Sequence, residues 1–188
     1  KYPTLAALLA AAKAAPGKLT YASSGDGSPQ HLAALMFETK TQARLLHVPY
    51  KGGAPAVNDT LAGTVDAMFA VLPEALPHVQ SGKLHALALM GPRRSPVLAD
   101  TPTMAEAGVP DLALSAWVAL LAPAKTPRPV IERLNRAVHA ALDDEVSAKL
   151  AQNGIETAPG TPEELQRTIA QEIRLHADLV KAAGVVPQ

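Results

Sequence analysis

Two short stretches of this sequence carry residues suited to binding an anion. The first, YASSGDGSPQHL at residues 21–32, holds three serines, two glycines and a proline that opens a helix. The second, HVPYKGGAPA at residues 47–56, holds a lysine and a glycine pair before another proline. At such strand-to-helix turns the first N–H groups of the helix lack backbone partners, and the helix dipole is positive. Each stretch therefore predicts a modest site for a carboxylate.

The residues that we assign to this chemistry are small or donate hydrogen bonds. Glycine permits a close approach and a positive φ, and serine hydroxyls donate to a carboxylate. Asp26 is poorly suited to an anion site, so we expect its side chain to point to solvent. The first set is Ser23, Ser24, Gly25, Gly27, Ser28, Gln30 and His31, and the second set is Tyr50, Lys51, Gly52, Gly53 and Ala54.

Each stretch is also typical of an ordinary strand-to-helix turn. Ser28 is then only an N-cap, and Lys51 is only a solvated charge. The presence of two such stretches favours ligand binding over a purely structural role. Turns that follow consecutive strands of a parallel sheet emerge at one edge, which is where ligands bind in such sheets. The binding hypothesis therefore depends on whether the two turns converge.

The elements that must position these residues alternate between strand and helix up to about residue 90. Short, continuously apolar runs between proline- and glycine-rich turns are typical of buried parallel strands. The order predicts an α/β fold, a parallel sheet with helices on both faces. Expected strands are residues 19–22, 45–48, 65–72, 84–90, 114–122 and 155–158, and expected helices are 4–15, 29–40, 51–62, 73–81, 102–107, 127–142, 143–153 and 162–183.

Composition excludes several classes of function. Lys plus Arg equals Asp plus Glu at 17 each, whereas a nucleic-acid-binding protein normally carries a basic excess, so we expect no nucleic-acid partner. The absence of cysteine excludes disulfides, thiol nucleophiles and thiolate metal sites. The longest apolar runs are too short to span a bilayer. The chain begins at Lys1 without a signal peptide, so we expect that a segment has been removed or that the chain is a fragment.

Other chemistry-bearing residues have structural explanations. Asp66 inside an apolar run is costly to bury alone, and we expect it to form hydrogen bonds that stabilise the fold. Trp117, the only tryptophan, is a candidate for the cleft but is more typical of a core. We expect no metal and no cofactor, because the remaining histidines share no metal-ligand spacing and suit packing or the surface. These are His47, His78, His85, His139 and His176.

Catalysis is the weaker alternative. Ser28 and His31 lie three residues apart on one helical face, which suggests a serine hydrolase. No G-x-S-x-G motif is present, no third member can be named, and Ser28 is better explained as an N-cap. Neither glycine turn completes a nucleotide-binding motif. We therefore expect that the protein is not an enzyme.

Several blocks, taken in order, resemble the Bug (TctC-like) solute receptors of tripartite tricarboxylate transporters. GSPQHL and VPYKGGAP are the most diagnostic blocks. This family often has an acidic residue after the phenylalanine of VDAMFAVL, where this chain has Ala70. The other matching blocks are VDAMFAVLPEALPHVQSGKLHALAL, RRSPVLADTPTMAEAGVP, SAWVALLAPAKTP and VIERLN.

The resemblance implies a periplasmic binding protein of type II-like fold, with a parallel or mixed sheet flanked by helices and two lobes. Residues 1–108 would form the second lobe, and residues 109–188 would be the returning segment of the first lobe. Family members begin with about a hundred further residues that include a YPPGG-like ligand loop, so the first lobe is incomplete here. The resemblance implies a periplasmic protein that captures a small carboxylate and delivers it to membrane permease subunits, with both glycine turns contacting the ligand.

The incomplete lobe leaves an alternative function open. A shortened relative would act as a sensory or interaction module without transport. The returning segment would expose a sheet edge and apolar helix faces, which predicts a homodimer or disorder in that half.

Overall fold

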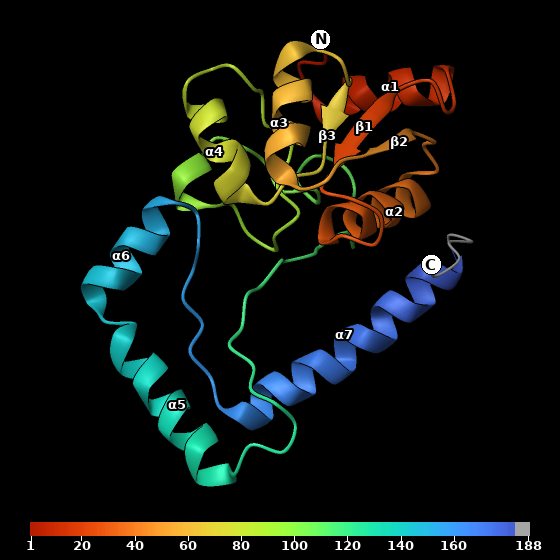
Figure 1. Ribbon diagram of the computed structural model, residues 1–188. Coiled ribbons are helices and arrows are strands. Elements are labelled where there is room, and N and C mark those ends of the chain that lie inside the picture. The colour runs from red at the N-terminus through yellow and green to blue at the C-terminus, as the bar shows by residue number, and fades with distance from the viewer. Residues whose placement is uncertain (183–188) are drawn as a thin grey trace.

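A three-stranded parallel sheet in the order β2-β1-β3 organises the first half of the chain in this computed structural model, which describes residues 1–182 (Figure 1). The strands are β1 (Thr20–Ser23), β2 (Leu46–Pro49) and β3 (Ala67–Met68). The central strand β1 pairs Ser23 with Pro49 of β2, and Ala22 with Met68 of β3. Because β1 has a neighbour on each side, its last three residues are buried.

Three helices cover this sheet, α1 (Leu5–Ala14), α2 (Pro29–Thr41) and α3 (Gly53–Ala62), and α4 (Leu72–Gln80) lies beside α3 (Figure 1). The local signals in the sequence predicted them correctly. Thr4 caps α1 by accepting from the Ala7 N–H, and Ser28 caps α2 by accepting from the His31 N–H. Gly63 ends α3 with a φ of 74°, in the left-handed region that glycine adopts easily.

Two apolar clusters, one on each face of the sheet, hold α1 and α2 on one face and α3 on the other. Alternate side chains of a strand point to opposite faces. Tyr21 therefore meets the ring of Phe69, which also contacts Phe37 of α2, whereas Ala22 packs with Ala56 of α3. The larger cluster consists of Leu5, Leu8, Ala12, Leu19, Phe37, Ala43, Met104, Val109 and Leu112. The fold is thus α/β with helices on both faces, as predicted.

Two of the expected strands are shorter than the sequence predicted. In residues 65–72 only Ala67–Met68 forms a ladder, and α4 already begins at Leu72 because Pro73 favours a helix start. In residues 84–90 a single parallel bridge joins Leu89 to Thr103. The apolar side chains there pack on the larger cluster, so their hydrophobicity reflects burial rather than strand pairing.

The connection after residue 90 also differs from the prediction. Residues 102–107, expected as a helix, are not helical: residues 104–107 form turns, and a short 3₁₀ helix, η1 (Pro96–Leu98), precedes them. The carboxylate of Glu106 accepts from the Thr103 N–H at 2.8 Å and from Arg94 Nε at 2.8 Å. These two bonds stabilise a compact turn where the composition suggested a helix.

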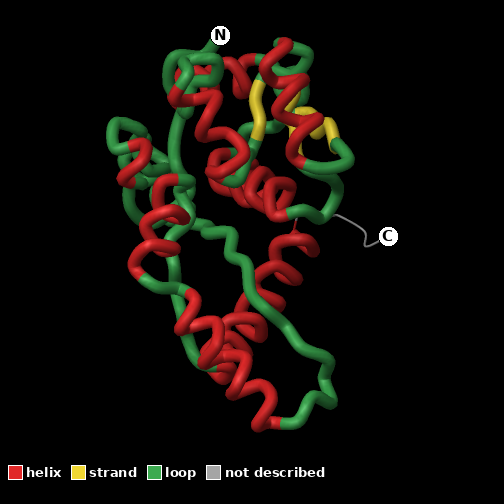
Figure 2. The backbone as a smooth tube through the Cα atoms, turned by 60° about the vertical axis from the view of Figure 1, so that its left-hand side comes forward, coloured by secondary structure: helices red, strands yellow, loops and turns green. Residues whose placement is uncertain are grey.

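The second half of the chain stands away from the sheet, as Figures 1 and 2 show. It contains α5 (Arg128–Ala141), α6 (Asp144–Gln152) and α7 (Pro162–Ala182); a two-residue connection joins α5 to α6, and an extended segment joins α6 to α7. The strands expected at residues 114–122 and 155–158 are wrong for the described part of the chain, because these extended segments have no neighbouring strand to pair with. Among the described residues after Leu112, none is buried.

Short polar contacts organise this second half. Thr161 and Glu164 form a capping box at the start of α7: the Glu164 carboxylate accepts from the Thr161 N–H at 2.8 Å, and the Thr161 hydroxyl accepts from the Glu164 N–H at 3.2 Å. Trp117 is 43% exposed and donates to Glu172 of α7 at 2.7 Å, so the core position expected for it is wrong. The expected end of α7 at Ala183 lies outside the described residues. No described helix is long and apolar enough to cross a membrane.

Candidate carboxylate-binding site

The two glycine turns predicted to bind an anion lie side by side at the carboxyl edge of the sheet. The Tyr50 N–H donates to the Ser23 carbonyl at 3.1 Å, and the Gly52 N–H donates to the Ser24 carbonyl at 3.1 Å. A Cβ on Gly25 would lie 3.1 Å from the Tyr50 carbonyl oxygen. The backbones of the two turns are therefore joined, and the convergence on which the binding hypothesis depends is present.

The first turn divides into a buried layer and a surface layer. Ser23, Gln30 and His31 are buried, and the Ser23 hydroxyl accepts from the Gly25 N–H at 3.1 Å. The half-buried Ser24 hydroxyl donates to Gln30 Oε1 at 2.8 Å. Buried members hold the loop, so the members at the surface are the ones that can reach a ligand. These surface members are Ser24, Gly25, Gly27 and Ser28.

The second turn leaves the N-terminus of α3 without a side-chain cap. Gly52 occupies the N-cap position with a φ of 112°, which favours glycine. Tyr50 directs its hydroxyl to Asp59 at 2.7 Å, and this hydrogen bond raises the pKa of Tyr50. Lys51 and Ala54 are exposed. The first N–H groups of α3, together with the nearby lysine, can therefore donate hydrogen bonds to an anionic group.

Sequence reasoning missed a third contributor, Glu74 in the first turn of α4. Its carboxylate lies against Gly53, where any Cβ would overlap it, and accepts from Gln30 Nε2 at 3.4 Å. No local signal in the sequence identifies Glu74, because it reaches this edge only through the place of β3 beside β1 in the sheet. The site thus comprises three helix starts and already contains one carboxylate of the chain.

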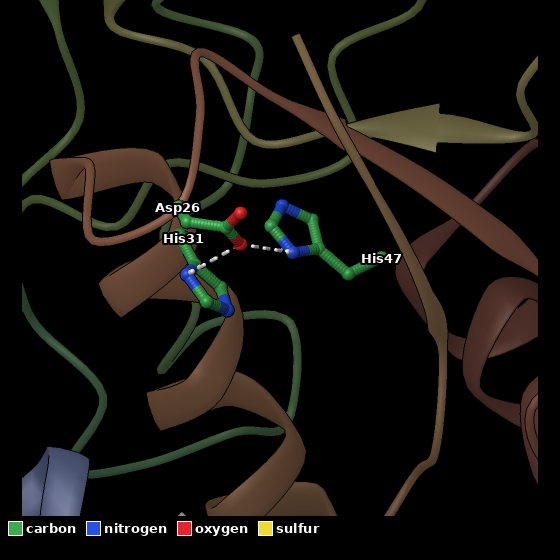
Figure 3. Close-up of side chains that lie close together, drawn as sticks. All are labelled: Asp26, His31 and His47. Atoms are coloured by element: carbon green, nitrogen blue, oxygen red, sulfur yellow. Dashed lines mark ion pairs between the residues drawn. The ribbon is translucent and has the colours of Figure 1, made fainter. Parts of the chain in front are cut away.

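Asp26 of the first turn lies close to His31 and His47, and Figure 3 shows its carboxylate facing one nitrogen of each ring. Asp26 Oδ1 lies 3.5 Å from His47 Nδ1 and 4.0 Å from His31 Nδ1. The side chain of Asp26 is 58% exposed, as expected for a residue that points to solvent, and its carboxylate also lies beside the two histidines, which the sequence did not indicate.

His47 packs in a stack of aromatic rings. Its ring lies 4.8 Å from that of Tyr21 and 4.1 Å from that of His31, with interplanar angles of 16° and 20°. Burial lowers the pKa of His47, the neighbouring His31 lowers it further, and Asp26 opposes both effects. The packing role expected for His47 agrees with this arrangement, although its proximity to His31 was not foreseen.

The cluster is poorly arranged for a metal ion. The lone pairs of imidazole lie in the ring plane, so two nearly parallel stacked rings do not direct them to one point. His31 Nδ1 also accepts from the Gly27 N–H at 3.1 Å. Coordination would require both histidine rings to turn.

The arrangement also gives little support to a serine hydrolase. The Ser28 hydroxyl accepts from the backbone N–H of His31 rather than contacting its ring, so the pair suggested by spacing has no base–nucleophile contact. Ser23 Oγ lies 2.6 Å from His47 Nε2, with Asp26 on the far side of that ring, which reproduces the order of a triad. Ser23 is fully buried, however, so a substrate has no access to it.

Comparisons with known proteins agree with this α/β fold. The model of the tripartite tricarboxylate transporter family receptor, TctC, matches residues 1–185. The chain belongs to this family. It is 38% identical to the BugT protein of Bordetella pertussis over 185 residues, which is 98% of this chain and 57% of BugT. A UPF0065 protein encoded between tcbD and tcbE in Pseudomonas sp. strain P51 is 40% identical over 88% of this chain and 50% of its own length.

Solved structures show the same fold. An R. palustris protein solved with adipate superimposes with a TM-score of 0.93 at 35% identity, covering 99% of this chain and 62% of the other. The periplasmic binding protein BugD superimposes with a TM-score of 0.86 at 32% identity, and the match covers 99% of this chain and 63% of BugD. MatC of Rhodopseudomonas palustris, solved with malate, superimposes with a TM-score of 0.84 at 31% identity, and the match covers 94% of this chain and 62% of MatC. The chain spans little more than half the length of the curated relatives it matches.

Proposed function

We propose that this protein is an extracytoplasmic receptor that captures a small carboxylate for a tripartite tricarboxylate transporter. The observation that carries the proposal is the pair of hydrogen-bonded turns, with the uncapped N-terminus of α3 beside the Ser24 hydroxyl. Backbone N–H groups and small hydroxyls suit a carboxylate and leave the rest of the ligand free to vary. The adipate and malate in two structures of the same fold support this class of ligand.

The division into lobes follows from the same proposal. Residues 1–108 would be one lobe, and residues 109–188 would return to the other lobe. Burial favours a boundary a few residues later, since Val109 and Leu112 still belong to the larger cluster and Leu112 is the last buried residue in the described chain. A ligand held at the sheet edge would then be enclosed when a second lobe closes over it.

The cellular setting comes from the family. A receptor of this kind acts in the periplasm, and its partners are the membrane permease subunits of the transporter. It needs no cofactor and performs no catalysis, and the burial of Ser23 supports a purely binding role.

A thermal-shift screen of organic acids tests the proposal, because a ligand that binds only the folded state raises the melting temperature. We expect a shift with at least one small carboxylate, lost in the double variant Ser24→Ala, Gly53→Val. Ser115→Ala, an exposed serine outside the site, serves as the control and should keep the shift. A folded protein that responds to no acid would overturn capture and leave the interaction module.

The hydrolase alternative has its own test. If the protein cleaves a chromogenic ester, Ser28→Ala would abolish the activity under that hypothesis. If the variant still cleaves the ester, the Ser28–His31 mechanism is wrong.

A further inference from the structure

Glu74 is an acidic side chain placed inside a site otherwise arranged for anions. It occupies the first turn of α4, where a carboxylate is stabilised by the dipole of its own helix. A glutamate with only that role needs no contact beyond α4. Its carboxylate instead reaches the first residue of α3, Gly53, and the amide of Gln30 at the start of α2.

The close approach to Gly53 depends on the missing side chain. Every other residue at this position would place its Cβ over the Glu74 carboxylate, with 2.6 Å to Oε2. Gln30, which holds Glu74, also accepts from the Ser24 hydroxyl at 2.8 Å. A continuous line of contacts therefore joins Ser24, Gln30, Glu74 and Gly53 across both turns.

The charge at this edge is consequently divided. The uncapped N–H groups of α3 and the exposed Lys51 favour a negative group, while Glu74 favours a positive group or a hydroxyl donor a short distance away. A second carboxylate at the same place would face like charge in a half-buried site, where solvent screens poorly.

We propose that Glu74 determines ligand class, so that the protein selects small carboxylates that also carry an ammonium or hydroxyl group over simple dicarboxylates. This inference rests on the proposed carboxylate capture and specifies what the rest of the ligand must be. Glu74 accepts a hydrogen bond from the ligand's ammonium or hydroxyl group, and the turns bind the ligand carboxylate. Selectivity then comes partly from repulsion of the wrong ligand.

A matched ligand series tests this assignment by calorimetry on the purified protein. γ-Aminobutyrate, γ-hydroxybutyrate, butyrate and glutarate differ mainly in the group at the end opposite the shared carboxylate, and shorter and longer homologues cover the unknown span. We expect the amino acid to bind at least ~10-fold more tightly than the dicarboxylate of matching length, because a like charge beside Glu74 at a partly buried site lowers affinity by at least this factor. The affinity for the hydroxy acid should lie between the two.

Glu74→Gln separates specificity from binding. We expect the substitution to lower the affinity for the amino acid and to raise the affinity for the dicarboxylate, each by about 10-fold. One charge is removed, while the carboxylate-binding turns remain. Glu145→Gln, an equivalent change on exposed α6, should leave the order unchanged. An unchanged ligand order in Glu74→Gln, or a dicarboxylate preference in the wild type, overturns the inference while capture stands. No binding of any ligand overturns both.

Discussion

The carboxylate of Glu74 lies against the backbone of Gly53, in space that the side chain of any other residue would occupy. Gly53 is the first residue of α3 and adopts a helical conformation, so its backbone does not itself require glycine. The constraint comes from the neighbouring helix, because a side chain at this position would have to displace the flexible end of Glu74. This contact couples α3 to α4 at the edge where both proposed ligand-binding turns emerge.

A double-mutant cycle measures that coupling. In a helix, alanine is about 0.5–1 kcal/mol more stable than glycine, so Gly53→Ala should stabilise a Glu74→Ala protein by about this amount. In the wild type the new methyl group displaces Glu74 from Gln30, which should cancel the gain. We expect a coupling energy of about 0.5–1.5 kcal/mol by urea denaturation. Additive effects of the two substitutions would contradict the close contact.

Stability should fall as pH drops below the usual histidine value of 6.5, because of His47. Its folded pKa is lowered by burial and by His31, so the unfolded chain binds the proton first. The stability due to neutral His47 is therefore full above pH 6.5 and decreases as pH falls toward the folded pKa. The slope for one proton is at most about 1.4 kcal/mol per pH unit.

Substitution identifies the source of this slope. His47→Gln removes the titrating ring, and we expect its unfolding free energy to vary less between pH 7 and pH 5 than that of the wild type. His78→Gln, at the end of α4 and outside the ring stack, should retain the wild-type slope. If both variants show the same pH dependence, His47 is not responsible.

Much of the first half was predictable because its signals are local. Ser28 followed by Pro29 specifies a helix start, and the convergence of the two turns follows from adjacent parallel strands. Glu74 could not be found in this way, since its contact with Gln30 requires the order β2-β1-β3 and the rotation of α4 about its axis. The orientation of Asp26 likewise depends on the histidine from β2.

The second half shows where apolar patterning misleads. The run at residues 114–122 has the composition of a buried strand, yet Val118 is fully exposed and the segment pairs with no described strand. An apolar run predicts that a segment is buried against something, whereas a strand also needs a hydrogen-bonding neighbour. Residues 84–90 pack against the larger cluster, but apart from one bridge they have no hydrogen-bonding neighbour strand among the described residues.

Asp66 should make the protein sensitive to acid. Burial alone raises its pKa, but hydrogen bonds from Lys1 and Thr20 together bring the pKa below the usual 3.8. The Thr20 N–H and hydroxyl donate to Asp66 at 2.9 and 3.1 Å, which joins the start of β1 to the segment before β3. A folded pKa below the unfolded one gives stability that is full above pH 3.8 and is lost as pH falls through the folded value.

Asp66→Asn tests this role. We expect a loss of about 1–2 kcal/mol at pH 7, mainly from the Thr20 contacts, because the exposed Lys1 pair is screened by solvent. The difference from the wild type should shrink in acid as the carboxyl group becomes protonated. Asp100→Asn, an exposed control, should cost less than about 0.5 kcal/mol. A constant difference across pH would contradict the assignment.

The exposed apolar side chains of the second half predict self-association or local opening. Val118, Leu120 and Leu121 are 101%, 64% and 68% exposed in one extended segment, and burial of such a surface is favourable. We expect a concentration-dependent shift toward a dimer in sedimentation velocity, which Leu120→Ser with Leu121→Ser should reduce. If the protein instead remains monomeric, amide hydrogens in residues 115–122 should exchange far faster than those of β1, because unpaired backbone is unprotected. A monomer with equal protection in both segments would contradict the open arrangement.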